Sequence, residues 1–276
     1  MSHLLSFAIN HMVAPRKSFA ELVELARALG LGEVEIRNDL EGVPISDGTP
    51  PERIRELAEA GGVRILSINA LQRFNDWNDA RAAEAKALAR YAQGCGAAAL
   101  VLCPVNDVGY RLTEGERQDR LRRALRGLAP ILAGAGIMGL VEPLGFEESS
   151  LRLKADAVEA IEELDLGDRF RLVHDTFHHY LAGEARMFPE WTGLVHISGV
   201  ADEQLPRGRM RDEHRVLVGP NDVLGNIAQI IALMEGYDGP YSFEPFAASV
   251  HAQGDIAGAL EISMHWIDRE IAKVPA

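Results

Sequence analysis

Cysteine is rare in this sequence, and its two copies form no recognisable motif. Among 276 residues the cysteines are Cys95 and Cys103, and no Cys-x-x-Cys pair occurs. The sequence therefore predicts no disulfide framework, and we interpret both thiols as buried packing residues in a reducing compartment.

Signals for membranes and for export are also missing. No apolar stretch approaches the roughly 20 residues that a membrane-spanning helix needs. The N-terminal segment MSHLLSFAINHM has neither the basic region nor the apolar region of a signal peptide. These features predict a cytoplasmic protein without a membrane partner.

Basic residues are outnumbered by acidic ones over the chain as a whole. There are 28 lysines and arginines against 41 aspartates and glutamates, so the formal net charge is −13. A field of this sign repels phosphate backbones, which disfavours a broad nucleic-acid-binding surface. No Gly-x-Gly-x-x-Gly follows any expected strand, so the dinucleotide-binding fingerprint of a doubly wound sheet is absent as well.

What the sequence does contain is a regular alternation of short β-rich runs with longer amphipathic segments. In one such segment Ser18 and Glu21 form an N-terminal capping box, and Gly30 ends the expected helix. The expected strands are Phe7–Asn10, Val34–Arg37, Arg64–Asn69, Ala99–Val105, Met138–Pro143, Phe170–Asp175, Leu194–Ser198 and Tyr241–Pro245.

Strands that alternate with helices indicate a parallel sheet covered by helices. Eight such units fill the chain, and an eightfold α/β barrel typically occupies about 250 residues. We therefore predict a single TIM (β/α)₈ barrel domain over residues 1–276, with an open doubly wound sheet as the rival. The segment Ala201–Pro220 is the one long irregular stretch, and such loops are often functional.

The last four expected strands each end in a residue that can bind a metal. These residues are Glu142, Asp175, His196 and Glu244. The carboxyl ends of barrel strands meet on one face, which would bring all four together. Three carboxylates and an imidazole suit one divalent cation such as Mn²⁺, Mg²⁺, Co²⁺ or Zn²⁺. Taken singly, each has an ordinary alternative as a helix cap, a core histidine or a turn residue.

Polar and aromatic residues near the other strand ends are candidates for binding a substrate. Amides and a guanidinium suit a polyhydroxylated ligand, and for Arg37 the structural alternative is an ion pair with Asp39. Aromatic side chains could wall a sugar face, although they more often simply pack. The polar candidates are Asn10, Arg37, Asn38, Asn69 and Asn106, and the aromatic candidates are Phe74, Trp77 and Phe246.

These motifs resemble the xylose-isomerase-like TIM-barrel superfamily of sugar isomerases and epimerases. The segment DTFHH at Asp175–His179 is similar to that of keto-sugar 3-epimerases, and VEPLGF and FEPF are similar to the superfamily's paired Glu-Pro motifs. INHMVAP, VEIRNDL, ILSINALQRFN, ALVLCPVND and DEHRVLVGPND look most like the inosose (2-keto-myo-inositol) isomerase branch.

The resemblance implies roles for individual residues. It implies that Glu142, Asp175, His196 and Glu244 bind the metal, and that His178 and Glu148 bind substrate. In the epimerases an arginine lies six residues after the histidine ligand, whereas here that position is Asp202. This departure weakens the ketohexose-epimerase interpretation. It leaves a loop arginine, namely Arg207, Arg209 or Arg215, to supply a cation.

The expected chemistry is proton transfer beside a carbonyl, with Glu142 and Glu244 as the acid and base. We predict a metal-dependent isomerase that moves a ketone between adjacent carbons of a cyclic keto-polyol through an enediolate. Alternatives on the same site are a keto-sugar 3-epimerase, an inosose dehydratase and a hydroxypyruvate-type isomerase. An abasic-site endonuclease, which needs further histidines and a basic groove, and a non-catalytic sugar-binding barrel are more distant alternatives. Assembly as a homodimer is left open.

Overall fold

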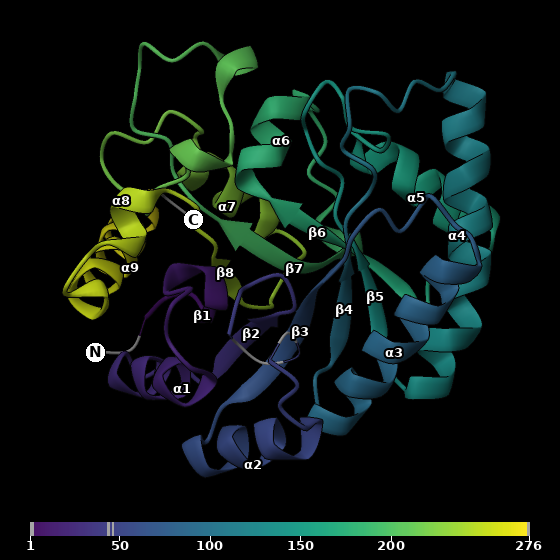
Figure 1. Cartoon of the computed structure of the whole chain (residues 1–276). Helices are drawn as coiled ribbons and strands as arrows, with labels where there is room; N and C mark the ends of the chain where they lie inside the picture. The colour runs from purple at the N-terminus through teal and green to yellow at the C-terminus, as the bar shows by residue number, and fades with distance from the viewer. Residues whose placement is uncertain (1–2, 43–44, 46, 275–276) are drawn as a thin grey trace.

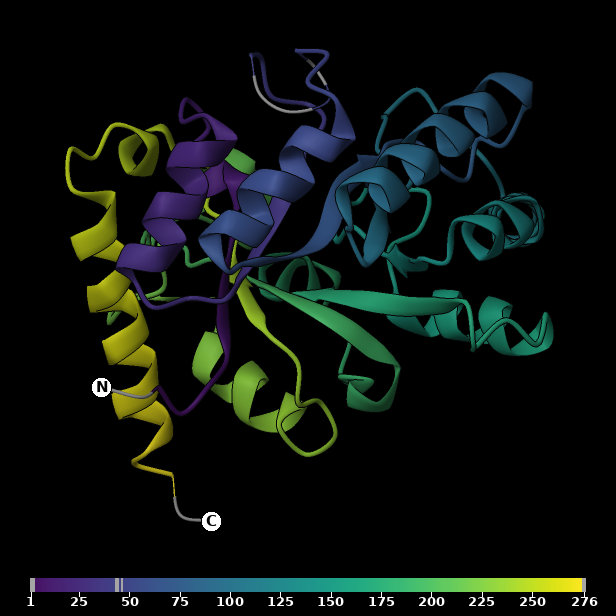
Figure 2. The same ribbon diagram turned by 90° about the horizontal axis from the view of Figure 1, so that it is seen from below.

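The chain folds into a closed barrel of eight parallel strands, as the sequence predicts. The computed structural model describes residues 3–42, 45 and 47–274. The strands follow one another around the barrel in chain order, and β8 pairs with β1 to close it. Helices surround the strands, and α9 lies beside α1 where the ring of helices closes (Figures 1 and 2).

The observed strands agree with the predicted ones in position but differ at their ends. They are β1 Phe7–Asn10, β2 Glu33–Arg37, β3 Arg64–Leu71, β4 Ala99–Leu102, β5 Met138–Val141, β6 Phe170–Asp175, β7 Thr192–Ile197 and β8 Tyr241–Phe243. Strands β5 and β8 end two residues earlier than predicted. Pro143 and Pro245 have no N–H to continue a ladder, so Glu142 and Glu244 lie just beyond the last paired residue.

The helices start and stop where local chemistry favours it. Ser18 and Glu21 form the predicted capping box at α1, and Gly30 follows the helix with φ of 69°. The main helices are α1 Phe19–Ala28, α2 Pro51–Gly61, α3 Asp79–Cys95, α4 Glu114–Ala135, α5 Lys154–Glu163, α6 Thr176–Ala182, α7 Asn226–Leu233, α8 Ala248–His251 and α9 Ile256–Ile271. Short 3₁₀ turns are η1 His11–Val13, η2 Pro189–Trp191, η3 Arg207–Arg209 and η4 Asp212–His214.

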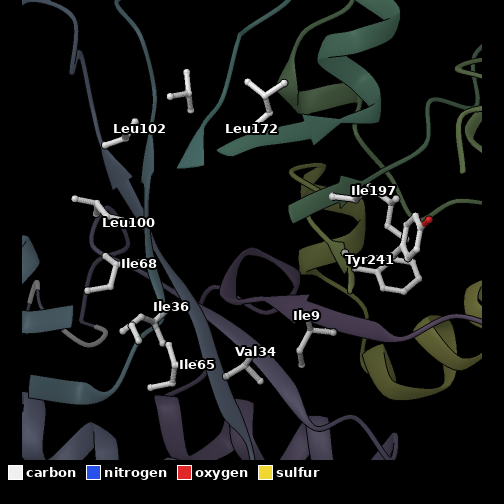
Figure 3. Packing of buried hydrophobic residues seen from close by; sticks show 14 of the residues in the cluster. Ile9, Val34, Ile36, Ile65, Ile68, Leu100, Leu102, Leu172, Ile197 and Tyr241 are labelled. Atoms are coloured by element: carbon white, nitrogen blue, oxygen red, sulfur yellow. The ribbon is translucent and has the colours of Figure 1, made fainter. Parts of the chain in front are cut away.

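Apolar side chains form two layers, one on each side of the strands. Leu100 and Leu102 pack outward among the residues that fill the space between strands and helices, as Figure 3 shows for this layer. Val101 belongs to a second, smaller cluster with Val173 and Leu194. Because successive strand residues point to opposite faces, this second cluster fills the barrel interior.

The irregular segment predicted at Ala201–Pro220 follows β7. It contains the turns η3 and η4, and Gly199 forms an isolated antiparallel bridge with Val216. Within the described parts of the chain, no helix is both long enough and apolar enough to cross a membrane.

Candidate metal centre

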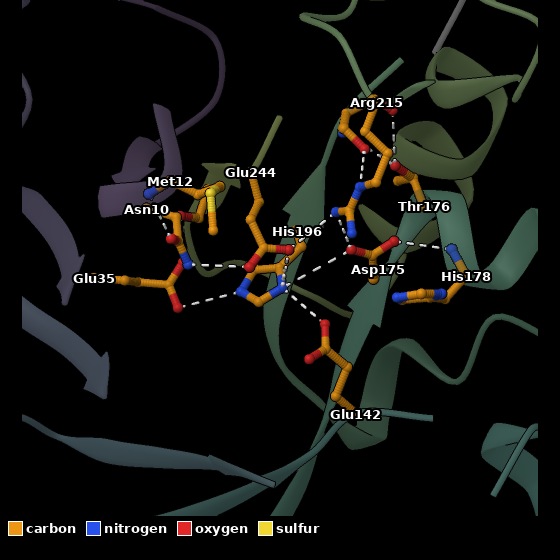
Figure 4. Close-up of polar contacts among 12 residues, drawn as sticks. Asn10, Met12, Glu35, Glu142, Asp175, Thr176, His178, His196, Arg215 and Glu244 are labelled. Atoms are coloured by element: carbon orange, nitrogen blue, oxygen red, sulfur yellow. Dashed lines mark hydrogen bonds and ion pairs between the residues drawn. The ribbon is translucent and has the colours of Figure 1, made fainter. Parts of the chain in front are cut away.

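The four predicted ligand residues converge at the carboxyl-terminal mouth of the barrel. Each of Glu142, Asp175, His196 and Glu244 offers a ligand atom, and these atoms lie within 4.8 Å of one another. None of the four side chains belongs to a residue more than 4% exposed. Figure 4 shows them grouped around the imidazole of His196. The coincidence of four polar strand ends therefore corresponds to one compact cluster.

One nitrogen of His196 faces all three carboxylates. Nδ1 lies 2.9 Å from Oε1 of Glu142, 3.3 Å from Oε2 of Glu244 and 4.0 Å from Oδ2 of Asp175. Burial alone would lower the pKa of His196, but the carboxylates around it raise this pKa well above its usual range. In the metal-free protein the imidazole therefore carries a proton where a cation would bind.

The other nitrogen of His196 meets a carboxylate that the sequence analysis missed. Oε2 of Glu35, on β2, lies 3.2 Å from Nε2 of His196. Glu35 is fully buried and also accepts hydrogen bonds from Ser67 at 2.6 Å and Ser242 at 2.5 Å. A carboxylate that accepts from one imidazole nitrogen leaves the other free for a metal. The signal was present, because Glu35 interrupts an apolar strand.

Two buried arginines bind the same carboxylates. Nη1 of Arg37 lies 2.6 Å from Oε1 of Glu244, while Nε and Nη2 bind Asp39, the partner considered for it. Nη2 of Arg215 donates to Oδ2 of Asp175 at 2.6 Å and to Oε2 of Glu244 at 3.0 Å. Although burial raises the pKa of Glu244, His196 and the two arginines outweigh it and lower this pKa.

The structure also distinguishes among the three loop arginines. Arg215 is 1% exposed and lies in the cluster, held by a hydrogen bond from its Nε to Ser198 Oγ of 2.9 Å. Arg207 is exposed and donates to the carbonyl of Tyr180 outside the cluster. Arg209 is exposed as well. The loop cation at this site is therefore Arg215.

The buried charges of the cluster do not balance without a further cation. Four carboxylates and two guanidiniums, none from a residue more than 4% exposed, share the site, namely Glu35, Glu142, Asp175, Glu244, Arg37 and Arg215. A metal-bound imidazole is neutral, so with His196 in this form the buried residues carry an excess of two negative charges. That excess equals the charge of one divalent metal ion. The oxygen and nitrogen ligands suit the same class of ion.

A cavity of about 320 Å³ opens beside the cluster. Asn69 and His178 line it, and among the described residues Nδ2 of Asn69 and Nδ1 of His178 have no hydrogen-bond partner. Asn106 and Phe246 line it too. These buried but unpaired polar atoms are available to a bound molecule.

Two of the predicted substrate-binding residues do not line this cavity. Asn10 lies behind Glu244, to which its amide donates at 3.3 Å. Glu148 lines two neighbouring hollows at the mouth instead. Asn38, another of the polar candidates, donates to the carbonyl of Ala70 at 3.2 Å and so binds the backbone. Direct contact of Asn10 or Glu148 with substrate stays a prediction.

Two aromatic predictions were wrong, and one thiol does more than pack. Phe74 is fully buried in the apolar core, and Trp77 packs against Gly127 between α3 and α4. Neither can wall the cavity, whereas Phe246 does, beneath the guanidiniums of Arg37 and Arg215. Sγ of Cys103 lies 3.2 Å from Oε2 of Glu142. Burial and Glu142 raise the pKa of Cys103, so its thiol is protonated and donates to this carboxylate.

The fold and the cluster together define an α/β-barrel protein with a carboxylate-rich centre at the catalytic face of the barrel. A family model described as "Xylose isomerase-like TIM barrel" matches residues 23–270. The chain belongs to this family, as its motifs predict.

Several solved structures are similar over almost their whole length. A xylose isomerase domain containing protein from Salmonella typhimurium LT2 is 35% identical, with 99% of this chain and 98% of that chain covered and a TM-score of 0.84. The IolI protein "with a binding zinc atom" is 19% identical, with 98% of this chain and 100% of that chain covered and a TM-score of 0.85. An L-ribulose 3-epimerase is 18% identical, with 98% of this chain and 95% of that chain covered and a TM-score of 0.71. The latter two likenesses show the fold alone. No curated protein matches the sequence.

Proposed function

We propose that this protein is a metal-dependent isomerase that moves a ketone between adjacent carbons of a cyclic keto-polyol of the 2-keto-myo-inositol type. The observation that carries the proposal is the buried excess of two negative charges beside a cavity with unpaired polar groups. Glu142, Asp175, His196 and Glu244 would hold one divalent ion. When bound, this ion supplies Lewis-acid stabilisation of negative charge on the substrate oxygen.

Two carboxylates are available to carry the proton, and their contacts differ. Glu244 is bound by both Arg37 and Arg215, which together with His196 lower its pKa and make it a weak base. No arginine in the described parts of the chain forms an ion pair with Glu142, whose partners are His196 and the Cys103 thiol. We therefore assign the main proton transfer to Glu142, with Glu244 as ligand and second proton carrier. Asp175 and His196 act as ligands.

The cavity suits a small neutral polyol. Its volume of about 320 Å³ lies at the small end of ligand pockets, which span about 300–1,000 Å³. The imidazole of His178 and the amide of Asn69 can bind hydroxyl groups, and the ring of Phe246 can cover an apolar face of the ligand.

Two comparisons support the general proposal of a metal site and a sugar-like substrate. The zinc named for the IolI structure agrees with the charge deficit of this site, and L-ribulose 3-epimerase acts on a keto-sugar by its name. The assignment to inositol or other carbohydrate metabolism in the cytoplasm, as one catalytic domain, rests on the sequence motifs. Neither a nucleic-acid partner nor a membrane partner is part of the proposal.

Metal removal and α-proton exchange test the proposal directly. The purified protein is treated with chelator, dialysed, and incubated with 2-keto-myo-inositol in deuterated water, with and without added Mn²⁺, Mg²⁺, Co²⁺ or Zn²⁺. We expect proton loss from the substrate, read by NMR, to disappear on chelation and to return with a metal. Full exchange by metal-free protein would refute the metal mechanism. Ligand-induced stabilisation without exchange would indicate a sugar-binding barrel instead.

A keto-sugar 3-epimerase is the second candidate because of Arg215. The loss of the epimerase arginine at Asp202 counted against this activity, but Arg215 brings a guanidinium to the same cluster from further along the loop. Product analysis separates the two. The isomerase moves the ketone to a neighbouring carbon, whereas the epimerase leaves it in place and inverts one hydroxyl-bearing carbon.

A further inference from the structure

A buried lysine lies behind the metal centre, on the outer side of β6. Lys154 is the first residue of α5 and is 4% exposed. Its Nζ lies 2.8 Å from Nδ1 of His174, 2.9 Å from Nδ1 of His179 and 3.1 Å from the carbonyl oxygen of Met187. An ammonium group has three protons, and these three acceptors use all of them.

The carboxylate near this lysine binds backbone groups instead of its ammonium. Glu184 is the nearby carboxylate, but it accepts from the backbone N–H groups of Lys154 and Ala155, at 3.1 and 2.9 Å, and so caps α5. No carboxylate forms an ion pair with the ammonium within the described ranges of the chain. Burial lowers the pKa of Lys154 to about 7. A buried, unpaired cation is costly for folding, so its presence calls for another explanation.

The two imidazoles that bind Lys154 mark the two ends of one short segment. His174 is the penultimate residue of β6, and His179 lies in the middle of α6. Between them are Asp175, a predicted ligand, and His178, which lines the cavity. Asp175 and His178 are coupled, because Oδ1 of Asp175 accepts the backbone N–H of His178 at 2.9 Å. A single ammonium therefore ties both ends of residues 174–179.

A hydrogen-bonded chain fixes the same segment from α7. Nε2 of His174 lies 2.9 Å from Oε1 of Gln229. The amide nitrogen of Gln229 donates to the carbonyls of Thr176 and Leu224 at 3.1 and 2.9 Å. Because Lys154 donates to Nδ1 of His174, this imidazole must carry its proton on Nε2 and donate to Gln229. The two carbonyls can only accept, so they fix the orientation of the Gln229 amide, and the ammonium requires the same tautomer of His174 from the other end of the chain.

We propose that Lys154 is a positioning residue that holds residues 174–179 so that Asp175 and His178 face the metal cavity. It touches neither substrate nor metal, and it acts through the two imidazoles. This inference rests on the metal site of the proposed function and does not depend on which substrate is used.

The test compares Lys154→Met with Lys86→Met, which removes an exposed lysine from α3. Zinc affinity of the chelated proteins is measured by competition with a chromophoric chelator. Hydrogen exchange of residues 174–179 is followed in the same samples. Loss of a residue that supports a ligand typically lowers metal affinity about 10–100-fold. We expect a loss near the lower end for Lys154→Met, with faster exchange of this segment, and neither change for Lys86→Met.

Equal zinc affinity and equal exchange in Lys154→Met and wild type would overturn the inference. If Lys154→Met does not fold, His179→Phe replaces it, since this change keeps a ring but removes one acceptor. The same two measurements then apply, with smaller changes expected and wild-type values again counting against the inference. If wild-type protein binds no zinc, the metal site itself fails. Hydrogen exchange then decides alone whether Lys154 orders the segment.

Discussion

Two buried polar clusters lie on opposite sides of β6, and their charges are arranged in opposite ways. On the inner side, Arg37 and Arg215 face carboxylates that outnumber them. On the outer side, Lys154 faces two imidazoles, and burial together with its charge lowers the pKa of each, to about 3 for His179. His174 and Asp175 are neighbours in sequence but belong to different clusters, because successive strand residues point to opposite faces.

This difference in charge distinguishes the inner cluster, which can bind an added cation, from the outer cluster, which contains the ammonium of Lys154. The inner cluster lacks positive charge and opens to a cavity, so it can accept an ion. The outer cluster is closed and has a surplus of one positive charge when Lys154 is protonated. The residue types fit these roles, since a buried guanidinium stays protonated whereas a buried ammonium can lose its proton.

The largest expected effect is on catalysis and comes from the inner cluster. Glu142→Gln removes the carboxylate assigned to proton transfer but keeps its shape and an oxygen for the metal. General acid–base groups typically contribute about 10²–10⁴-fold to rate, and we expect α-proton exchange to fall by a factor in this range. Glu33→Gln is the control, because Glu33 is the first residue of β2 and lies at the end of the strand away from the cavity. A wild-type exchange rate in Glu142→Gln would refute the assignment.

The next effect is on stability and contrasts the two kinds of buried cation. Arg215→Met leaves Asp175 and Glu244 without their shared guanidinium. Removing one partner of a buried ion pair typically costs about 3–5 kcal/mol, and urea unfolding of metal-free protein should show a loss of this size. Added Zn²⁺ should restore part of it by supplying positive charge. Lys154→Met, which breaks no ion pair, should cost clearly less, and equal losses in both variants would contradict the comparison.

The fold and the inner cluster could be predicted because both follow from periodicity. Strand–helix alternation placed the eight strands, and Asp175 and His196 lie at or next to the carboxyl ends of their strands. Arg215 could not be chosen over Arg207 or Arg209, since the loop that carries all three has no repeating pattern to assign a direction to each side chain. The predictions for Phe74 and Trp77 were wrong for a related reason, because aromatic side chains fill a core as readily as they line a cavity.

The outer cluster was only half predictable. Strand alternation explains why His174 points away from Asp175, where it is buried and hydrogen-bonded. Nothing in the sequence marks Lys154 as buried, because it begins a helix where exposed lysines are common. Its partners come from β6, α6 and the loop after α6, and only the folded chain brings them together.

The pH dependence of stability should distinguish Lys154 from the arginines. Its pKa falls from 10.5 to about 7 on folding, so between these values the unfolded chain binds more protons. Stability therefore rises with pH in this window. Relative to Lys154→Met, the wild-type free energy of unfolding should increase by up to about 1.4 kcal/mol per pH unit. Urea titrations of both proteins from pH 7 to pH 9.5 measure this increase. If the free energies of unfolding of the two proteins changed with pH in parallel, burial would not lower the pKa of Lys154.

The smallest expected effect is on metal affinity and concerns Glu35. This residue supports the ligand His196 from inside the barrel, whereas Lys154 supports the segment of Asp175 from outside it. Glu35→Gln keeps a hydrogen-bond acceptor for Nε2 of His196 but removes the charge that makes the imidazole a strong ligand. The outer-partner rule predicts about a 10–100-fold loss of metal affinity, measured by chelator competition for Zn²⁺. Glu33→Gln is the matched control, since Glu33 lies two residues away on the same strand and pairs with the exposed guanidinium of Arg64 instead of the metal centre.

The direction of this last result depends on charge as well as geometry. Glu35 contributes one of the four buried negative charges, so its neutralisation leaves an excess of only one to attract a dication. If geometry alone mattered, Glu35→Gln would bind Zn²⁺ as tightly as wild type, because the amide oxygen can still accept from Nε2. A loss in Glu35→Gln together with unchanged binding in Glu33→Gln would mean that the buried charge of the barrel interior, and not the chain's overall −13, sets the affinity of the centre.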